Sequence, residues 1–365
     1  MTYFKLKPEV YLVLGKTKST LHNLVEEKLL WIDNRLGNSI RKAESGESLS
    51  DQEFKMLNVF FKKYEWGMFT DYPVFIDKFR SINVYNEKKM HKNTPFIETA
   101  TLQLTNECNL NCSFCGEMFC PSCRVIEGQA PALSLDEWKL AVDKLEGYGV
   151  KTILLTGGEA VTSPYFQDIK EYINGKNISL SIHTNGIGHI EGLAEDNHII
   201  ISLFNPKELA NIVKMYKKNK MVSIILYDLQ NKEKPKVIPE SWQVIFSKTK
   251  SIPVTNKSMV NVDFDAFFSR KLGNNCLDKK ILVAYDGSIY PCMELKNKLG
   301  NLRDNEFHMA LQKLMAHYWK KGVDQNQNKC KECEFRYACN ACSYFNTESC
   351  QYDLEEGKWI SSFTN

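Results

Sequence analysis

The placement of the cysteines constrains this chain more than any other feature of its sequence. Five of the twelve cysteines lie between residues 108 and 123, and the other seven lie between residues 276 and 350. Cysteines that served only as small core residues would be more scattered along the chain. In a reducing compartment, cysteines spaced this densely indicate metal binding rather than disulfides. The two groups therefore predict two metal-binding regions.

Composition narrows the class of protein further. The 365 residues suffice for two or three compact domains, and 43% hydrophobic with 25% charged residues is ordinary for a globular protein. The net charge of +3 is small and does not indicate a nucleic-acid binder. No apolar run approaches the roughly 18 residues that span a membrane, and the first residues lack the apolar core of a signal peptide. We therefore expect a cytoplasmic protein with neither a nucleic-acid nor a membrane partner.

The first cysteine group predicts an iron–sulfur cluster with one open iron. Cys108, Cys112 and Cys115 follow a predicted strand on one short loop. Three thiolates on such a loop can wrap a cubane cluster and leave one iron without a protein ligand. An electron-transfer ferredoxin would supply a fourth cysteine in the same run, and the spacing to Cys120 is not the ferredoxin one. Tetrahedral zinc coordination is the alternative.

Residues 1–95 contain no cysteine, and their pattern predicts a small α+β domain. Ser50 and Glu53 form a capping box at the start of one helix, and Gly67 suits its end. The expected elements are strands at Tyr3–Leu6 and Val10–Leu14, a helix at Leu21–Trp31, and a helix from Ser50 whose apolar face includes Phe54, Leu57, Phe61 and Tyr64.

Residues 96–255 alternate strand and helix signals, which predicts an α/β fold with a parallel sheet. The expected strands are Thr101–Thr105, Thr152–Thr156, Ser179–Thr184, Ile199–Phe204, Val222–Tyr227 and Trp242–Phe246. The expected helices begin at Ser134, whose capping box includes Glu137, at Ser163-Pro164 and at Asn205-Pro206. Six such strand–helix repeats predict a partial (β/α)6 barrel, with functional residues at the carboxyl ends of its strands.

Residues 256–350 form a loop-rich segment that carries the second cysteine group, and residues 351–365 form a short polar tail. The cysteines of this segment are Cys276, Cys292, Cys330, Cys333, Cys339, Cys342 and Cys350. Seven cysteines in one loop-rich segment cannot all serve core packing, so we expect metal ligands among them.

The first cysteine loop resembles the cluster loop of the radical S-adenosylmethionine (SAM) superfamily, including its Cys-Asn-Leu opening and Phe114 before the last cysteine. The resemblance implies a [4Fe–4S] cluster on Cys108, Cys112 and Cys115 that binds SAM at its open iron and cleaves it to a 5′-deoxyadenosyl radical. It also implies SAM contacts at the ends of later strands, namely Gly157, Gly158 and Glu159 for the amino group, and Thr184, Asn185 and Ser202 for the carboxylate and ribose. We interpret His183 as a packed strand histidine and assign no general base.

The second cysteine group resembles the SPASM domain, which carries two auxiliary [4Fe–4S] clusters, and residues 286–292 are typical of it. The resemblance implies three clusters in all, with Cys276, Cys292 and Cys342 on auxiliary cluster I and Cys330, Cys333, Cys339 and Cys350 on auxiliary cluster II. The last CxxC pair departs from the family, which usually has three intervening residues. The three-cysteine set either leaves an iron open to a substrate thiolate or is completed by Cys120 or Cys123, whose own CxxC spacing also allows a redox dithiol.

The combination of segments resembles enzymes that modify ribosomally made peptides. Residues 1–95 resemble PqqD-like leader-recognition domains (RRE), although an N-terminal decoration of the catalytic domain is an equal alternative. Thioether-forming maturases of ranthipeptides and sactipeptides fit best, and the grasp-with-SPASM type is another candidate. The implied partners are a precursor peptide, with a leader and a cysteine-containing core, and an external electron donor such as flavodoxin or ferredoxin.

Other functions remain as alternatives to thioether formation. Carbon–carbon crosslinking is one of them. Side-chain oxidation as in sulfatase maturation is disfavoured, because Met293 stands where those enzymes carry an aspartate as the proposed base. A non-enzymatic iron–sulfur or zinc module is the alternative from a different class of protein.

Overall fold

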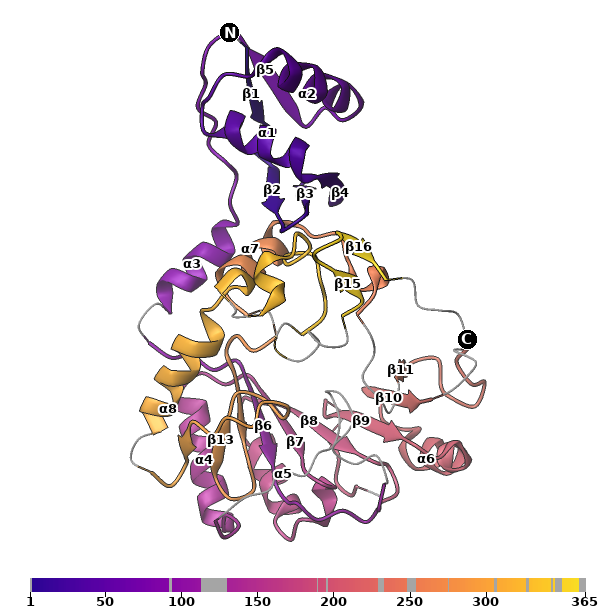
Figure 1. Ribbon diagram of the computed structural model, residues 1–365. Helices are drawn as coiled ribbons and strands as arrows, with labels where there is room; N and C mark the ends of the chain where they lie inside the picture. Colours follow the sequence, from indigo (N-terminus) through magenta and orange to yellow (C-terminus); the bar gives the residue numbers. More distant parts are fainter. Residues whose placement is uncertain are drawn as a thin grey trace. The chain divides into compact units, whose positions relative to one another are not determined.

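The computed structural model describes residues 2–91, 94–112, 130–188, 190–194, 196–228, 233–247, 254–274, 276–304, 307–325, 328–342, 344 and 350–360. The chain divides into two compact units. The first consists of Met1–Lys92, Pro253–Cys276 and Lys320–Asn365, and the second of Asn93–Ile252 and Leu277–Trp319. Figure 1 shows the helices and strands of both units, coloured along the sequence from indigo at the amino terminus to yellow at the carboxyl terminus. The domain boundaries expected from the sequence stay a prediction.

The amino-terminal part of the first unit combines short antiparallel strands with two amphipathic helices. Its elements are β1 (Tyr3–Leu6), β2 (Val10–Leu14), β3 (Lys18–Asn23), β4 (Lys28–Asp33), α1 (Asn34–Glu44), α2 (Asp51–Lys63), β5 (Gly67–Thr70) and α3 (Ile82–Met90). Strands β2, β3 and β4 form one sheet in that order, while β1 pairs with β5. Phe4, Leu21, Ile40 and Leu57 lie fully buried at the centre of their common core. The predicted strands β1 and β2 are confirmed residue for residue.

The segment predicted as a helix at Leu21–Trp31 is a β-hairpin, so that prediction is wrong. Strands β3 and β4 pair antiparallel across the turn that joins them. The Asn23 side chain accepts the backbone N–H groups of Val25 and Glu26, at 3.1 and 3.0 Å. An asparagine that bonds the backbone two and three residues ahead stabilises a turn. This local turn, together with pairing to β2, outweighs an apolar spacing that was compatible with a helix.

Helix α2 begins as expected and ends differently. Ser50 and Glu53 form the predicted capping box, with each side chain bonded to the backbone of the other residue. The helix ends at Lys63, whereas Gly67 begins β5 and is not the helix stop. A Cβ on Gly67 would meet the ring of Phe4, so this glycine permits close packing of β5 on β1.

The carboxyl-terminal segments of the first unit share a core with its amino-terminal part. They contain α7 (Phe264–Leu272), 3-10 turns at Asn256–Ser258, Val323–Gln325 and Lys329–Glu332, and the hairpin of β15 (Tyr352–Asp353) and β16 (Lys358–Trp359). Phe267 and Phe268 of α7 pack with Val13, Leu24 and Tyr337. Residues more than 300 positions apart thus belong to one packed cluster.

The second unit is built on a nine-stranded sheet with the order β11-β10-β9-β8-β7-β6-β12-β13-β14. Its strands are β6 (Thr99–Gln103), β7 (Thr152–Thr156), β8 (Ser179–Thr184), β9 (His198–Leu203), β10 (Val222–Tyr227), β11 (Gln243–Ser247), β12 (Lys280–Val283), β13 (Ser288–Tyr290) and β14 (Gly300–Asn301). Strands β6 to β11 are parallel neighbours in sequence order. Strand β12 joins β6 in parallel from the other side, and β13 and β14 add an antiparallel edge.

Among the described residues of the second unit, three α-helices follow parallel strands and a fourth follows β14. The helices and helical turns are α4 (Leu135–Gly147), a 3-10 turn (Ala160–Thr162), α5 (Phe166–Asn174), a 3-10 turn (Pro206–Glu208), α6 (Leu209–Tyr216), α8 (Phe307–Leu314) and a π-helical turn (Met315–Trp319). The capping box of Ser134 and Glu137 is present, and the apolar stripe of α4 around Trp138 is buried as predicted. No helix within the described ranges is both long and apolar enough to cross a membrane.

The predicted α/β fold with six parallel strands is confirmed. Three of the six strands match their predicted bounds, and the other three are displaced by one or two residues. The carboxyl ends of β6, β7, β8 and β9 therefore lie side by side along one edge of the sheet. This edge is where the residues expected to bind a cofactor should meet.

Candidate functional site

The loop that carries the first cysteines leaves β6 and is held against the end of β7. The Gly158 amide donates to the Thr105 carbonyl at 3.0 Å, and the Glu159 amide donates to the Glu107 carbonyl at 2.8 Å. A Cβ on Gly157 would lie 2.5 Å from the Thr105 oxygen, and one on Gly158 would lie 2.8 Å from the Glu107 carbonyl carbon. Both approaches are too close for any side chain. The glycine pair therefore allows the end of β7 to fix the start of the cluster loop.

Glu159 presents a buried carboxylate beside this loop. Its side chain is 2% exposed, and its oxygens accept the backbone N–H groups of Asn185 at 2.7 Å and Val161 at 3.5 Å. Burial raises the pKa of Glu159, although these hydrogen bonds oppose the shift. A buried carboxylate is stabilised by a cationic partner. The site therefore fits the ammonium of an amino-acid moiety such as that of SAM.

Asn185 links Glu159 to the cluster loop. Its backbone N–H binds the Glu159 carboxylate, and its side-chain Nδ2 lies 2.6 Å from Asn109 Oδ1 and 3.9 Å from Cys108 Sγ. The Leu110 N–H also points at this sulfur, at 3.4 Å. N–H groups directed at a sulfur are the contacts that tune an iron–sulfur site. The ends of β6, β7 and β8 thus bring a cysteine, a carboxylate and an amide together.

The other residues expected to contact SAM lie along the same edge. The Thr184 hydroxyl accepts the Gly186 N–H at 3.0 Å, and Gly186 has the left-handed φ of 78° that a glycine adopts without strain. Ser202 is buried and lies 2.7 Å from His183 Nε2. Burial lowers the pKa of His183 to about 4, so this histidine is neutral at pH 7. His183 is packed in the sheet, and the SAM contacts of Thr184 and Ser202 stay predictions.

Two buried polar side chains that the sequence analysis missed hold the loop after β8. Tyr216 of α6 donates its hydroxyl to the Gly188 carbonyl at 2.6 Å. Burial, and secondarily the nearby Glu159 charge, raises the pKa of Tyr216 to about 12. Lys170 of α5 is 1% exposed and donates to the Gly192 carbonyl at 3.0 Å. A lysine inside the apolar stripe of α5 was the available sequence signal for such a role.

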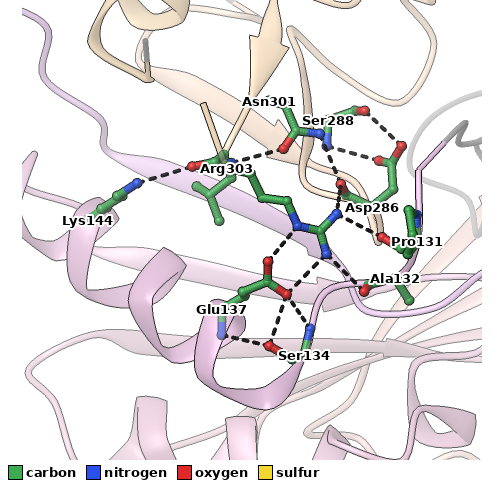
Figure 2. Close-up of polar contacts among 10 residues, drawn as sticks. Pro131, Ala132, Ser134, Glu137, Lys144, Asp286, Ser288, Asn301 and Arg303 are labelled. Carbon is green, nitrogen blue, oxygen red and sulfur yellow. Dashed lines mark hydrogen bonds and ion pairs between the residues drawn. The ribbon is translucent and has the colours of Figure 1, made fainter. Parts of the chain in front are cut away.

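Arg303, also missed from the sequence, holds the residues that lead into α4 (Figure 2). Its Nε lies 2.5 Å from Glu137 Oε1, and its terminal nitrogens donate to the carbonyls of Pro131 at 2.9 Å and Ala132 at 3.0 Å. Arg303, followed by the backbone of Ser134, lowers the pKa of Glu137 to about 2. The capping box of α4 is therefore also a salt bridge to the segment that follows β14.

The Asp286-Gly287 turn also contacts Arg303, because a terminal nitrogen of Arg303 donates to the Asp286 carbonyl at 3.3 Å (Figure 2). Both Ser288 donors bind the Asp286 carboxylate at 2.9 Å, and Asn301 Nδ2 binds the Asp286 carbonyl at 3.0 Å. Gly287 has a φ of 81°, which the tight turn between β12 and β13 requires. This turn precedes Cys292 and joins β12 to β13, which pair antiparallel.

The four cysteines predicted for auxiliary cluster II all belong to the first unit. They are Cys330, Cys333, Cys339 and Cys350. Isolated β-bridges pair Cys339 with Met259 and Cys350 with Val254. The Lys329 ammonium donates to the Cys350 carbonyl at 3.2 Å. The backbone of these cysteines is therefore anchored from several directions.

The thiols of this set are close enough to affect one another. Burial, together with the neighbouring Cys339 and Cys350 thiols, raises the pKa of Cys330 to about 12. Burial also raises the pKa of Cys333 and Cys339. Neighbouring half-buried thiols repel one another when ionised, and a bound metal removes that cost by deprotonating and coordinating them. These residues therefore fit an iron–sulfur cluster.

The remaining predicted ligands are less constrained. Cys276 and Cys342 belong to the first unit and Cys292 to the second, so auxiliary set I stays a prediction. Cys115, Cys120 and Cys123 lie outside the described residues. Among the residues that are described, no three histidine, cysteine, aspartate or glutamate side chains surround a single position that could hold one metal ion.

Comparison with known families identifies the class of protein. Residues 102–226 match the radical SAM superfamily, and residues 275–334 match SPASM, an iron–sulfur cluster-binding domain. The chain therefore contains a radical SAM segment followed by a SPASM segment. The first match spans β6 to β10 and includes Cys108 and Glu159, and the second contains Cys292 and Cys330.

Among individual proteins, the chain is similar to two from Bacillus subtilis (strain 168). It is 36% identical to the sporulation killing factor maturation protein SkfB over 89 residues, 24% of this chain and 20% of SkfB. It is 33% identical to the antilisterial bacteriocin subtilosin biosynthesis protein AlbA over 90 residues, 24% of this chain and 18% of AlbA. The similarity therefore spans about a fifth of either relative.

The fold extends beyond these matches. The crystal structure of Streptococcus suis SuiB bound to precursor peptide SuiA aligns over 93% of this chain and 95% of that chain. The TM-score is 0.50 at 12% identity, which shows a shared fold.

Proposed function

We propose that this protein is a radical SAM maturase that forms thioether crosslinks in a ribosomally made precursor peptide. The observation that carries the proposal is the meeting of Cys108, Glu159 and Asn185 at the carboxyl ends of adjacent parallel strands. The SPASM domain supports a peptide substrate, as do the names of SkfB and AlbA, which refer to the maturation of a sporulation killing factor and to bacteriocin biosynthesis.

The cofactor site follows from these residues. Cys108, Cys112 and Cys115 would hold a [4Fe–4S] cluster, which when reduced supplies the electron that splits SAM and yields a 5′-deoxyadenosyl radical. The buried Glu159 carboxylate would bind the SAM ammonium, and Gly157 and Gly158 would place it there by allowing the backbone to approach the cluster loop closely. Thr184, Asn185 and Ser202 would face the carboxylate and ribose. The electron would come from an external flavodoxin or ferredoxin.

The amino-terminal residues 1–95 would hold the leader of the peptide. Strand β4 lies at an edge of its three-stranded sheet. An edge strand can pair with an extended peptide, which main-chain hydrogen bonds then hold.

We further propose that each of the two SPASM cysteine sets holds an auxiliary cluster, which gives three clusters in all. The enzyme would act in the reducing cytoplasm.

The test is an anaerobic reaction of the reconstituted enzyme with SAM, dithionite and the precursor peptide encoded beside its gene. Thioether formation predicts 5′-deoxyadenosine and a mass loss of two hydrogens per crosslink. For each crosslink, one peptide thiol should also stop reacting with an alkylating reagent. The Cys108→Ala variant should produce neither. A peptide that loses two hydrogens but keeps all its thiols would indicate carbon–carbon crosslinking instead. Deoxyadenosine without any mass loss on the peptide would refute the crosslinking proposal.

Metal analysis tests the less specific part of the proposal. Three cubanes predict about 12 iron atoms with matching sulfide per chain, and the Cys108→Ala variant should lose about four of them. Zinc without sulfide would indicate a structural metal module rather than a radical enzyme.

A further inference from the structure

The auxiliary II loop, which we define as residues 330–339, is bonded directly to the amino-terminal sheet of the first unit. The Thr20 hydroxyl of β3 donates to the Glu334 carbonyl at 2.8 Å, within the protein interior. The Lys16 N–H, in the turn between β2 and β3, donates to the Glu332 carbonyl at 2.9 Å. The main chain on both sides of Cys333 is therefore held by the β2–β3 hairpin.

Arg336 closes the loop against the same hairpin. Its guanidinium donates at 2.8 Å both to the Leu14 carbonyl at the end of β2 and to the Cys333 carbonyl. One side chain thus bonds the amino-terminal sheet and a predicted cluster ligand. Gly15 makes this approach sterically feasible, because a Cβ there would lie 2.8 Å from the Glu334 nitrogen.

Glu334, the neighbour of Cys333, is the buried centre of the contact. The side chain is 1% exposed. Its Oε1 accepts the Trp31 indole N–H from β4 at 2.9 Å and also the Tyr352 hydroxyl from β15. The Trp31 ring lies 5.6 Å from the Phe335 ring, which makes an edge contact with Tyr352 at 5.3 Å. A strand of the amino-terminal sheet thereby orients the residues on the carboxyl side of Cys333.

We propose that the amino-terminal sheet forms one wall of the auxiliary II site, with Trp31 as its positioning residue. This inference rests on the proposed assignment of Cys333 and its partners as cluster ligands. Outer-shell hydrogen bonds orient metal ligands, and hydrogen bonding around the sulfurs sets the reduction potential of an iron–sulfur cluster. A shift of Glu334 moves the backbone dipoles next to the Cys333 sulfur. The domain that we propose to hold the leader would then help to set the properties of a redox centre.

The experiment compares Trp31→Phe with a matched tryptophan in the same domain. Trp66 is more buried than Trp31, but its indole N–H likewise donates to a glutamate, Glu26, at 3.0 Å. Reduced, reconstituted full-length protein is followed by EPR during a redox titration. The signal that disappears in Cys333→Ala identifies auxiliary cluster II.

In Trp31→Phe, we expect about 12 irons per chain, as in the wild type, but a changed line shape and midpoint potential for that one signal. Trp66→Phe should superimpose on the wild type throughout. Equal signals in the wild type and Trp31→Phe would overturn the proposal. If Trp31→Phe does not fold, Tyr352→Phe replaces it, because Tyr352 is the other donor to the same Glu334 oxygen and the same shift is expected.

Failure of the ligand assignment has a different outcome. If Cys333→Ala keeps every signal and all of its iron, Cys333 ligates no cluster, and both the assignment and the role of Trp31 fall. If Cys333→Ala loses one signal and Trp31→Phe leaves that signal unchanged, the assignment stands and only the role of Trp31 is overturned.

Discussion

The salt bridge between Arg303 and Glu137 makes a quantitative prediction about how α4 is held. The pKa of Glu137 is about 2 in the folded protein against an ordinary 4.5. At 1.36 kcal/mol per pH unit this limits the stabilisation of the ionised form to about 3 kcal/mol. The two side chains are 32% and 33% exposed, and the Ser134 capping bonds contribute part of the effect. With solvent screening, the share due to the ion pair should be about 1 to 1.5 kcal/mol.

A double-mutant cycle isolates this share. Arg303→Met, Glu137→Gln and the double variant are compared with the wild type by hydrogen exchange of peptides covering residues 130–140, which gives local opening free energies. The cycle removes the contribution of the Arg303 bonds to the Pro131 and Ala132 carbonyls, because these are lost in both arms. A coupling energy below about 0.3 kcal/mol would show that solvent screens the pair completely, contrary to our reasoning.

The dependence on pH has a definite sign. The folded-state pKa of Glu137 lies below its unfolded value, so the stabilisation is complete above pH 4.5 and is lost as the pH falls toward about 2. The difference between the wild type and Arg303→Met should therefore shrink across this window in cluster-free protein. Glu53 provides the control, since it completes the capping box of α2 and pairs with a lysine, Lys42, at 3.2 Å. The corresponding coupling there should be about 0.5 kcal/mol or less.

Four further substitutions test the candidate site and the corrected fold. Glu159→Gln should weaken SAM binding by roughly 10- to 150-fold in equilibrium dialysis, because it removes a charge-assisted hydrogen bond. It should also raise the melting temperature, because it relieves a buried charge. Unchanged affinity would exclude Glu159 as the ammonium partner. Gly158→Ala should abolish SAM cleavage because its Cβ collides with the cluster loop, whereas Gly147→Ala, with open space around it, should stabilise α4 by about 0.5 to 1 kcal/mol. Asn23→Ala should lower the stability of the first unit by about 1 to 2 kcal/mol in denaturant unfolding, and no loss would contradict the turn.

The regular elements of the sheet were predictable because their signals are local. The parallel strands are segments of five or six residues with apolar or β-branched side chains at alternating or successive positions. Ser134 with Glu137 marks a helix start through contacts only three residues apart. The hairpin of β3 and β4 was not predictable in this way. Its apolar residues allow a helical spacing as well, and the choice depends on the Asn23 turn and on pairing with β2.

The cofactor site likewise has features that the sequence predicted and features that it did not. The cysteine spacing and the Gly157-Gly158-Glu159 run were visible because each motif places several functional groups within a few residues. The roles of Tyr216, Lys170 and Arg303 were not visible, since each of them bonds carbonyl groups from a distant part of the chain. Any carbonyl can serve as such an acceptor, so no residue type marks the partner in advance.

The two cysteine groups are the most distinctive feature of the sequence, and they determined the class of chemistry. They could do so because ligand type and spacing are properties of short segments. Tertiary structure alone decided how these groups are supported. It joined Asn185, at the end of β8, to Cys108 across strand β7, and it placed Trp31 against Glu334, about 300 residues further along the chain. Such contacts depend on how separate elements pack, and packing is a property of the whole fold that no local spacing records.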